Sequence, residues 1–297
     1  MPTASRRSRD LVFTLYGDYL LGRPDPVWVG SLITLLGKLG LSPASVRTAL
    51  SRMTHKGWLA AERRGLRSYY GLTKRGRRLL ESGRERIYHR PRLEAWDGTW
   101  HLVSYSIPEA DRHRRNQFRV KLLWLGCGAL GNGLWLSPYD VGAAVREIAE
   151  TLKVSRYTEV FRAEHVGFAP VDQLVAQCWD LSAINRRYAA FLARWHPFLD
   201  HCVTCRLAVA GGDGAEARHL CTSPEGCFVR RFQLVHEYRT FPMTDPFLPA
   251  SLLPADWKGE AATHLFETYH AVLADPAERY VDEICRAGDV VESEPAA

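Results

Sequence analysis

The sequence predicts an α+β protein built in three consecutive parts, and three observations support this. A chain of 297 residues is too long for one ordinary hydrophobic core. Helical and strand periodicities alternate along it. Its charge is uneven, because residues 1–92 contain 19 Lys or Arg against 6 Asp or Glu, whereas residues 93–297 contain 20 against 27. We therefore expect domains over residues 1–90, 93–170 and 171–297.

The composition narrows the class of protein further. Hydrophobic residues make up 46% of the chain, which suits packed globular structure. No run of eighteen apolar residues is present, and the basic start of the chain has no apolar segment of the kind a secretory signal needs. Seven cysteines, an odd number, fit reduced thiols better than a disulfide framework. We expect a cytoplasmic protein that does not enter a membrane.

The first domain begins with helical patterns. Leu11 and Leu15 recur at helical spacing after Asp10, a possible N-cap, and a second helix is expected over residues 27–39. A Gly-containing turn follows, and Ser42 can then cap a third helix over residues 43–56. Helix, short turn and helix is the helix-turn-helix pattern.

The third helix has two distinct faces. Val46, Leu50 and Met53 share the side that should pack inward, while the opposite side is short, polar or basic. No acidic residue lies between Leu39 and Leu59, whereas the outer face of an ordinary amphipathic helix more typically holds Glu and Lys. Such a face suits the major groove of DNA, where Arg bonds guanine. The predicted contact residues are Ser45, Arg47, Thr48, Ser51, Arg52 and His55.

A β-hairpin is expected directly after this helix. Gly57 ends the helix, strands begin near Trp58 and return over residues 68–72, and Thr73 can cap the next helix. Such a hairpin forms the wing of a winged helix-turn-helix domain. Its basic tip should reach backbone phosphate or the minor groove. The predicted wing contacts are Arg63, Arg64 and Arg67.

The residues from 28 to 73 resemble the PaaX-type family of transcriptional repressors. The resemblance rests on residues 46–52, on Gly-Trp-Leu at 57–59 and on the segment 67–73. It implies a regulator, not an enzyme, that needs no cofactor or metal. Members repress operons for phenylacetate and related aromatic acids, and an acyl-CoA thioester, typically phenylacetyl-CoA, releases them from double-stranded operator DNA. A homodimer on a palindromic operator is expected. This chain has Leu66 where the family usually carries a basic residue.

The middle segment predicts a ferredoxin-like domain in the order β-α-β-β-α-β. The Gly-rich run from 126 to 133 is interpreted as turns, since it follows a helix and lacks the Gly-Lys-Ser/Thr ending of a phosphate loop. The expected elements are strands at 100–107, 134–136 and 157–166, with helices at 109–124 and 140–152.

The middle segment also resembles the family's central domain, which is similar to small CRISPR-associated endonucleases. Those enzymes need a metal-binding Asp at the end of the first strand, where this chain has Ser104, Tyr105 and Ser106. Nuclease activity is therefore not expected. A nucleic-acid-binding protein with a degenerate nuclease-like domain remains an alternative.

The C-terminal segment predicts helices over residues 172–198, 228–239 and 260–273, and residues 88–92 look like a linker before the middle domain. Proline-rich steps near residue 250 resemble the family's C-terminal domain. An acyl-CoA site needs cations for phosphates and an apolar slot. The candidates for it are Arg112, Arg115, Arg119, Tyr238, Arg239 and Trp257.

Two further patterns are open to a chemical interpretation. Adjacent His236 and Glu237 could form an acid–base pair, but a structural role fits two neighbours on a helix better. Four thiols could hold zinc, although the second pair is too widely spaced for a usual zinc knuckle. We expect ordinary thiols, with a zinc-dependent sensor as the alternative. These thiols belong to Cys202, Cys205, Cys221 and Cys227.

Overall fold

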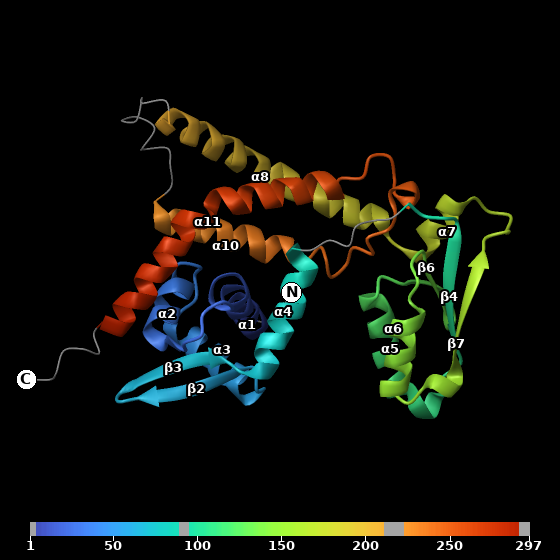
Figure 1. Cartoon of the computed structure of the whole chain (residues 1–297), viewed down its shortest axis with the longest axis horizontal. Coiled ribbons are helices and arrows are strands. Elements are labelled where there is room, and N and C mark those ends of the chain that lie inside the picture. Colours follow the sequence, from blue (N-terminus) through green and yellow to red (C-terminus); the bar gives the residue numbers. More distant parts are fainter. Residues whose placement is uncertain (1–3, 89–94, 211–222, 291–297) are drawn as a thin grey trace, which may run out of the picture. The chain divides into compact units, whose positions relative to one another are not determined.

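A computed structural model describes residues 4–88, 95–210 and 223–290 (Figure 1). The protein has a mixed α+β fold with two small antiparallel sheets in the described part. It divides into two compact units. Unit 1 comprises Met1–Arg90, Phe191–Arg239 and Ala261–Ala297, and unit 2 comprises Pro91–Ala190 and Thr240–Glu260. None of the described helices combines the length and apolar character needed to cross a membrane.

Unit 1 begins with the expected series of helices followed by a β-hairpin. A three-stranded sheet in the order β1-β3-β2 accompanies the helices. The elements are α1 (Ala4–Leu15), a π-helical turn η1 (Tyr16–Leu20), β1 (Val27–Trp28), α2 (Val29–Gly37), α3 (Pro43–His55), β2 (Leu59–Arg64), β3 (Arg67–Leu72) and α4 (Lys74–Tyr88).

Three details at this end differ from the sequence-based expectation. Asp10 lies inside α1 and is not its N-cap. Val27 and Trp28 do not start the second helix, because they pair with Tyr70 and Tyr69 of β3 as strand β1. Tyr88 is the last residue of α4 and not part of a linker. The remainder of the expected linker, residues 89–92, falls outside the described residues.

The C-terminal helices of unit 1 pack directly on its N-terminal helices. They are the later part of α8 (Leu181–Ala210), α10 (Pro224–Tyr238) and most of α11 (Gly259–Val290). Thr14 of α1 shares a hydrogen bond of 2.8 Å with the Nδ1 atom of His236 in α10. The rings of Tyr19 and Phe228 lie 5.3 Å apart, and Tyr88 of α4 contacts Phe266 of α11. One core therefore holds both ends of the chain together.

Unit 2 has the predicted element order β-α-β-β-α-β, although the sequence located only three of its four strands. Its strands form one antiparallel sheet in the order β5-β6-β4-β7. Phe118 and Leu122 of the first helix and Val145 of the second are fully buried with Val103 of the sheet. The elements are β4 (Thr99–Tyr105), η2 (Glu109–Asp111), α5 (Arg112–Trp124), β5 (Gly128–Gly131), β6 (Leu134–Ser137), α6 (Gly142–Thr151), η3 (Ser155–Tyr157) and β7 (Thr158–Glu164).

Two expectations for unit 2 and its surroundings are wrong. The Gly-rich run is not only a set of turns, because strand β5 lies within it and pairs with β6. The single helix expected over residues 172–198 is divided into α7 (Val171–Cys178) and α8. Trp179 lies at the break in extended conformation, and its Nε1 atom donates to the Gly126 carbonyl. Residues 211–214, Gly-Gly-Asp-Gly, favour a break in the chain by their sequence, and they lie outside the described residues.

Candidate nucleic-acid interface

Both ends of α3 are fixed by local sequence. The Ser42 side chain accepts a hydrogen bond from the Ser45 backbone N–H, and Pro43 occupies the first helical position, as the sequence predicts. At the other end Gly57 adopts a positive φ of 69°, and the N–H of Trp58 reaches back to the Met53 carbonyl. This pattern closes a helix by satisfying its last carbonyl groups. The two ends of α3 are therefore determined by residues within the helix or next to it.

The two faces of α3 are separated as predicted. Val46, Leu50 and Met53 are fully buried on the inner face. On the outer face Ser45 is half-buried and the other candidates are exposed: Arg47, Thr48, Ser51, Arg52 and His55. The helix consequently presents a continuous polar and basic surface to solvent.

The hairpin that follows ends in a tight two-residue turn. Arg64 and Arg67 are the last paired residues of β2 and β3, which leaves Gly65 and Leu66 as the turn. Gly65 has a φ of 55°, a conformation that glycine adopts without strain. The sequence favours a turn over residues 63–65, but Arg63 and Arg64 are paired residues at the end of β2, and the turn begins at Gly65.

The wing arginines are arranged by contacts along the hairpin. Arg64 pairs with Glu62 at 2.9 Å, and its guanidinium lies over the ring of Tyr69. Arg67 lies over the ring of Trp28 at 4.7 Å. Stacking of this kind holds the side-chain stem while leaving the edge of the guanidinium able to donate. The basic groups are thus partly preorganised along the hairpin.

The base of the hairpin is tied to the end of α3. The Thr73 hydroxyl donates to the Gly57 carbonyl at 2.7 Å and accepts from the Gly76 N–H, so it caps α4 as predicted. The Thr73 backbone N–H also bonds the Trp58 carbonyl. These bonds fix the base of the hairpin and the first turn of α4 at the C-terminal end of α3.

Sequence reasoning left one basic cluster of this region undecided and omitted one residue of it. The undecided residues, for which phosphate contact and a solvated helix are equally expected, lie at the start of α4: Lys74, Arg75, Arg77 and Arg78. Arg77 is half-buried and donates to the Leu21 carbonyl, whereas the other three are exposed. Arg75 donates to the carbonyl of Lys56, an exposed residue after α3 whose ammonium lies over the Trp58 ring. Lys56 could have been predicted as a DNA contact from the sequence, because no acidic residue lies between positions 40 and 58.

The effector candidates do not gather within one unit. Tyr238 and Arg239 belong to unit 1, whereas Trp257 and the three arginines of α5 belong to unit 2. The Tyr238 ring is buried and stacks on Phe266 with a centroid distance of 3.8 Å, so it presents no surface to a ligand in this structure. Arg239 is half-buried, and burial lowers the pKa of its guanidinium.

The α5 and Trp257 candidates are more accessible. Arg112 and Arg115 both pair with Glu109, and the hydrogen bond from Arg115 lowers the pKa of that carboxyl group. Arg119 is exposed, and Trp257 packs edge-on against the ring of Tyr188. The α5 arginines offer cations to an anion, but they do not line either of the cavities of the described residues that are considered next.

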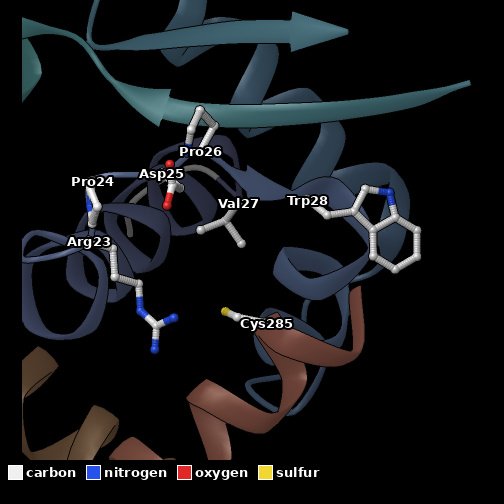
Figure 2. A pocket seen from close by; sticks show the side chains of 7 residues that line it. All are labelled: Arg23, Pro24, Asp25, Pro26, Val27, Trp28 and Cys285. Carbon is white, nitrogen blue, oxygen red and sulfur yellow. The ribbon is translucent and has the colours of Figure 1, made fainter. Parts of the chain in front are cut away.

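Each of the two units contains a cavity that can be compared with a ligand site. Figure 2 shows the first, of about 160 Å³, lined by residues 23–28 and by Cys285 of α11. That volume is below the range of about 300–1,000 Å³ that is usual for small-molecule sites. The second, of about 450 Å³ in unit 2, is lined by α7, the start of α8 and residues 251–254. Its charged lining residues are Asp172 and Asp180, which would repel the phosphates of an acyl-CoA.

The residues considered for zinc or acid–base chemistry are placed as follows. Cys227 is buried in α10, while Cys221 and the side chains of Cys202 and Cys205 lie outside what the structure describes. Glu237 accepts from the indole of Trp195 and pairs with Arg194. Within the described ranges, no three His, Cys, Asp or Glu side chains are grouped as a metal site.

Comparison with known proteins identifies the class of protein. The chain matches, in order, the family described as "PaaX-like protein" over residues 7–76, "PaaX protein central Cas2-like domain" over residues 93–175 and "PaaX-like protein C-terminal domain" over residues 179–283. The chain therefore belongs to the PaaX-like family, as the sequence motifs indicated.

Two individual proteins are similar along most of their length. The chain is 34% identical over 277 residues to the transcriptional repressor PaaX of Escherichia coli strain K12, covering 92% of this chain and 82% of that repressor. Its structure is also similar to that of an uncharacterized protein from Mycobacterium tuberculosis, with a TM-score of 0.57 and 25% identity over 90% of this chain and 97% of the other.

Proposed function

We propose that this protein is a DNA-binding transcriptional repressor in which α1 to α4 and the hairpin β2–β3 act as a winged helix-turn-helix domain. In this proposal α3 lies in the major groove, and Arg47 and Arg52 contact bases or phosphates. The observation that carries the proposal is the outer face of α3, which is exposed and free of acidic residues from position 40 to 58. The hairpin beside it adds three arginines. We also propose a two-fold dimer on a palindromic operator, because helix-turn-helix repressors commonly bind DNA in that way.

We further propose that an acyl-CoA thioester, such as phenylacetyl-CoA, releases the protein from DNA. The family resemblance supports this, and so does the packing of α10 and α11 on α1 and α4. A ligand that favours a DNA-incompetent arrangement of those C-terminal helices changes the surroundings of the DNA-binding helices directly. The operon and the identity of the thioester belong to this proposal and not to the family assignment.

The DNA-binding proposal is tested by substituting Arg47→Ala together with Arg52→Ala. A bidentate Arg–guanine pair contributes about 1–3 kcal/mol, so losing two should weaken binding by roughly a hundredfold or more. If either arginine binds phosphate instead, the slope of log K against log salt falls by about 0.9 for each phosphate that the variant no longer neutralises. The measurement is a fluorescence-anisotropy titration at several salt concentrations, with a duplex that the wild-type protein selects from a random pool.

A matched control removes the same charge elsewhere. Arg146 and Arg186 are exposed in unit 2, and Arg146→Ala with Arg186→Ala should bind DNA as the wild type does. Equal binding by both double variants would refute the assignment of α3.

Phenylacetyl-CoA added to the wild-type complex, with free CoA as the comparison, tests the effector separately. Failure of phenylacetyl-CoA to release DNA would refute it as the effector, and the DNA-binding proposal would stand.

A further inference from the structure

The tip of the hairpin holds an unusually exposed apolar side chain. Leu66 is 95% exposed, whereas the other exposed large apolar residues in the described part of unit 1, Leu79 and Phe198, are 47% and 40% exposed. The cross-strand pairing runs up to Arg64 and Arg67, and Gly65 closes the turn with a positive φ. The leucine therefore projects into solvent from a short, well-paired support.

The surroundings of this leucine are strongly basic. Arg64 and Arg67 flank the turn, and Arg63 donates its Nε hydrogen to the Gly65 carbonyl. An apolar tip between cations is poorly suited to contact a protein core or a membrane interior. It is well suited to a narrow anionic groove, because arginines are attracted to the strongly negative minor groove of DNA.

The length of the hairpin matches the spacing of the grooves. Each strand has six residues, so the hairpin extends about 20 Å from the end of α3 at about 3.4 Å per residue. A helical turn of DNA spans about 34 Å, which places the neighbouring minor groove about 17 Å from the centre of the major groove. If α3 occupies a major groove, the hairpin tip can therefore reach the next minor groove.

We propose that Leu66 is an apolar wedge that enters the minor groove and inserts at a base step, bending the DNA. This inference rests on the proposed DNA-binding function and adds a specificity element to it. Inserted leucines unstack bases and kink the duplex toward the major groove. Pyrimidine–purine steps unstack most easily, so the protein prefers a TA or CA/TG step about half a turn from the bases read by α3.

The proposal predicts that DNA shape depends on Leu66 more strongly than affinity does. Burial of the leucine favours insertion, while unstacking of the base step opposes it, and the two effects are of similar size. Removing the side chain therefore removes the gain from its burial and the cost of unstacking together, and the net change in affinity is small. We expect Leu66→Ala to change affinity by less than about tenfold while abolishing the bend.

The experiment uses the full-length protein and a duplex that the wild type selects from a random pool. Donor and acceptor dyes at the two ends report bending, and 2-aminopurine beside the proposed step reports unstacking. Wild type and Leu66→Ala are compared with Leu66→Arg, which restores a basic tip, and with Leu79→Ala as the control for loss of an exposed leucine. We expect wild type and Leu79→Ala to shorten the end-to-end distance of the duplex and to brighten 2-aminopurine. Leu66→Ala and Leu66→Arg should give neither signal.

The outcomes separate the two proposals. A bend and a 2-aminopurine signal that persist in Leu66→Ala would overturn the wedge, as would a wild-type complex with neither signal, while the DNA-binding proposal would stand in both cases. A wild-type protein that selects no duplex would overturn both. Leu66→Arg should bind a straight duplex with a salt slope steeper by about 0.9 if the new arginine contacts phosphate.

Discussion

At the scale of single residues, a buried carboxylate joins both ends of the chain. The side chain of Asp18, in the π-helical turn after α1, is 3% exposed and accepts a hydrogen bond of 2.8 Å from Tyr88 at the end of α4. His270 of α11 lies 3.1 Å away, and Arg231 of α10 lies 3.5 Å away and also pairs with Glu278. The turn η1 and the helices α4, α10 and α11 therefore all contribute side chains to the surroundings of the Asp18 carboxylate.

The surroundings of Asp18 set the sign of its pKa shift. Burial is the largest single effect and favours the neutral acid. The hydrogen bond from His270, the charge of Arg231 and the hydrogen bond from Tyr88 together outweigh it and hold the pKa of Asp18 below its ordinary value. A carboxyl group with a lowered pKa stabilises the folded state above the pKa of the unfolded chain. That stabilisation is lost as the pH falls through the lowered pKa.

We predict that Asp18→Asn is strongly destabilising. The substitution leaves Arg231 buried opposite a neutral amide, and breaking a buried ion pair typically costs about 3–5 kcal/mol of unfolding free energy. The control is Glu278→Gln, because Glu278 is 56% exposed and its pair with Arg231 should be worth no more than about 1 kcal/mol. Urea unfolding at neutral pH measures both changes.

The pH dependence of Asp18→Asn provides an independent check. The variant should lose part of the steep fall in stability that the wild type shows in acid, since it lacks the titrating carboxyl group. An equal loss of stability in both variants, or an unchanged acid limb in Asp18→Asn, would show that Asp18 does not act as the central charge of this cluster.

At the scale of elements, local signals predicted some parts of the structure and could not predict others. The N-cap of α3, its terminating glycine and the hairpin turn lie within a few residues of the structure they form, so α3 and the hairpin were predicted nearly to their ends. Strands β1 and β5 were missed because each is short and exists by pairing with another strand. The break before α8 was missed because Trp179 bonds a carbonyl far away in the sequence.

We predict that two glycines of α4 respond in opposite ways to alanine. A Cβ atom on Gly76 would lie 2.0 Å from the Trp58 carbonyl oxygen, whereas a Cβ on Gly83 would meet nothing within 4 Å. Alanine in a helix interior is favoured over glycine by about 1 kcal/mol, so Gly83→Ala should raise the free energy of unfolding by up to that amount. Gly76→Ala must displace α4 from the base of the hairpin and should lower it.

Thermal and urea unfolding of the two variants test this pair. Because Gly76 sits where α4 meets the hairpin, Gly76→Ala should also weaken DNA binding, and Gly83→Ala should not. A stabilised Gly76→Ala would mean that the close approach of α4 to Trp58 is not required.

At the scale of the whole molecule, the sequence presents three consecutive segments, but the compact units do not follow that order. Unit 1 gathers the first ninety residues with two later stretches of the chain. Apolar periodicity shows that α10 and α11 bury one face, yet it does not say against which partner. For the same reason the outer face of α3 was predictable from its own residues, while the Asp18 cluster, whose members are up to 260 residues apart, was not.

This arrangement predicts that residues 1–90 do not fold stably when separated from the rest of the chain. Tyr19 and Leu20 are buried in the full chain, and the Tyr19 ring packs on Phe228 of α10. The isolated fragment would also lose Arg231, the buried cation that faces Asp18. We expect the fragment to bind a hydrophobic dye and to show no cooperative thermal transition by circular dichroism, whereas the full chain unfolds cooperatively.

A fragment that melts cooperatively near the temperature of the full chain would show that the C-terminal helices are not needed for its folding. The expected result would mean instead that those helices complete the core of the proposed DNA-binding domain, so the proposed thioester acting on them would reach α1 and α4 without a separate relay.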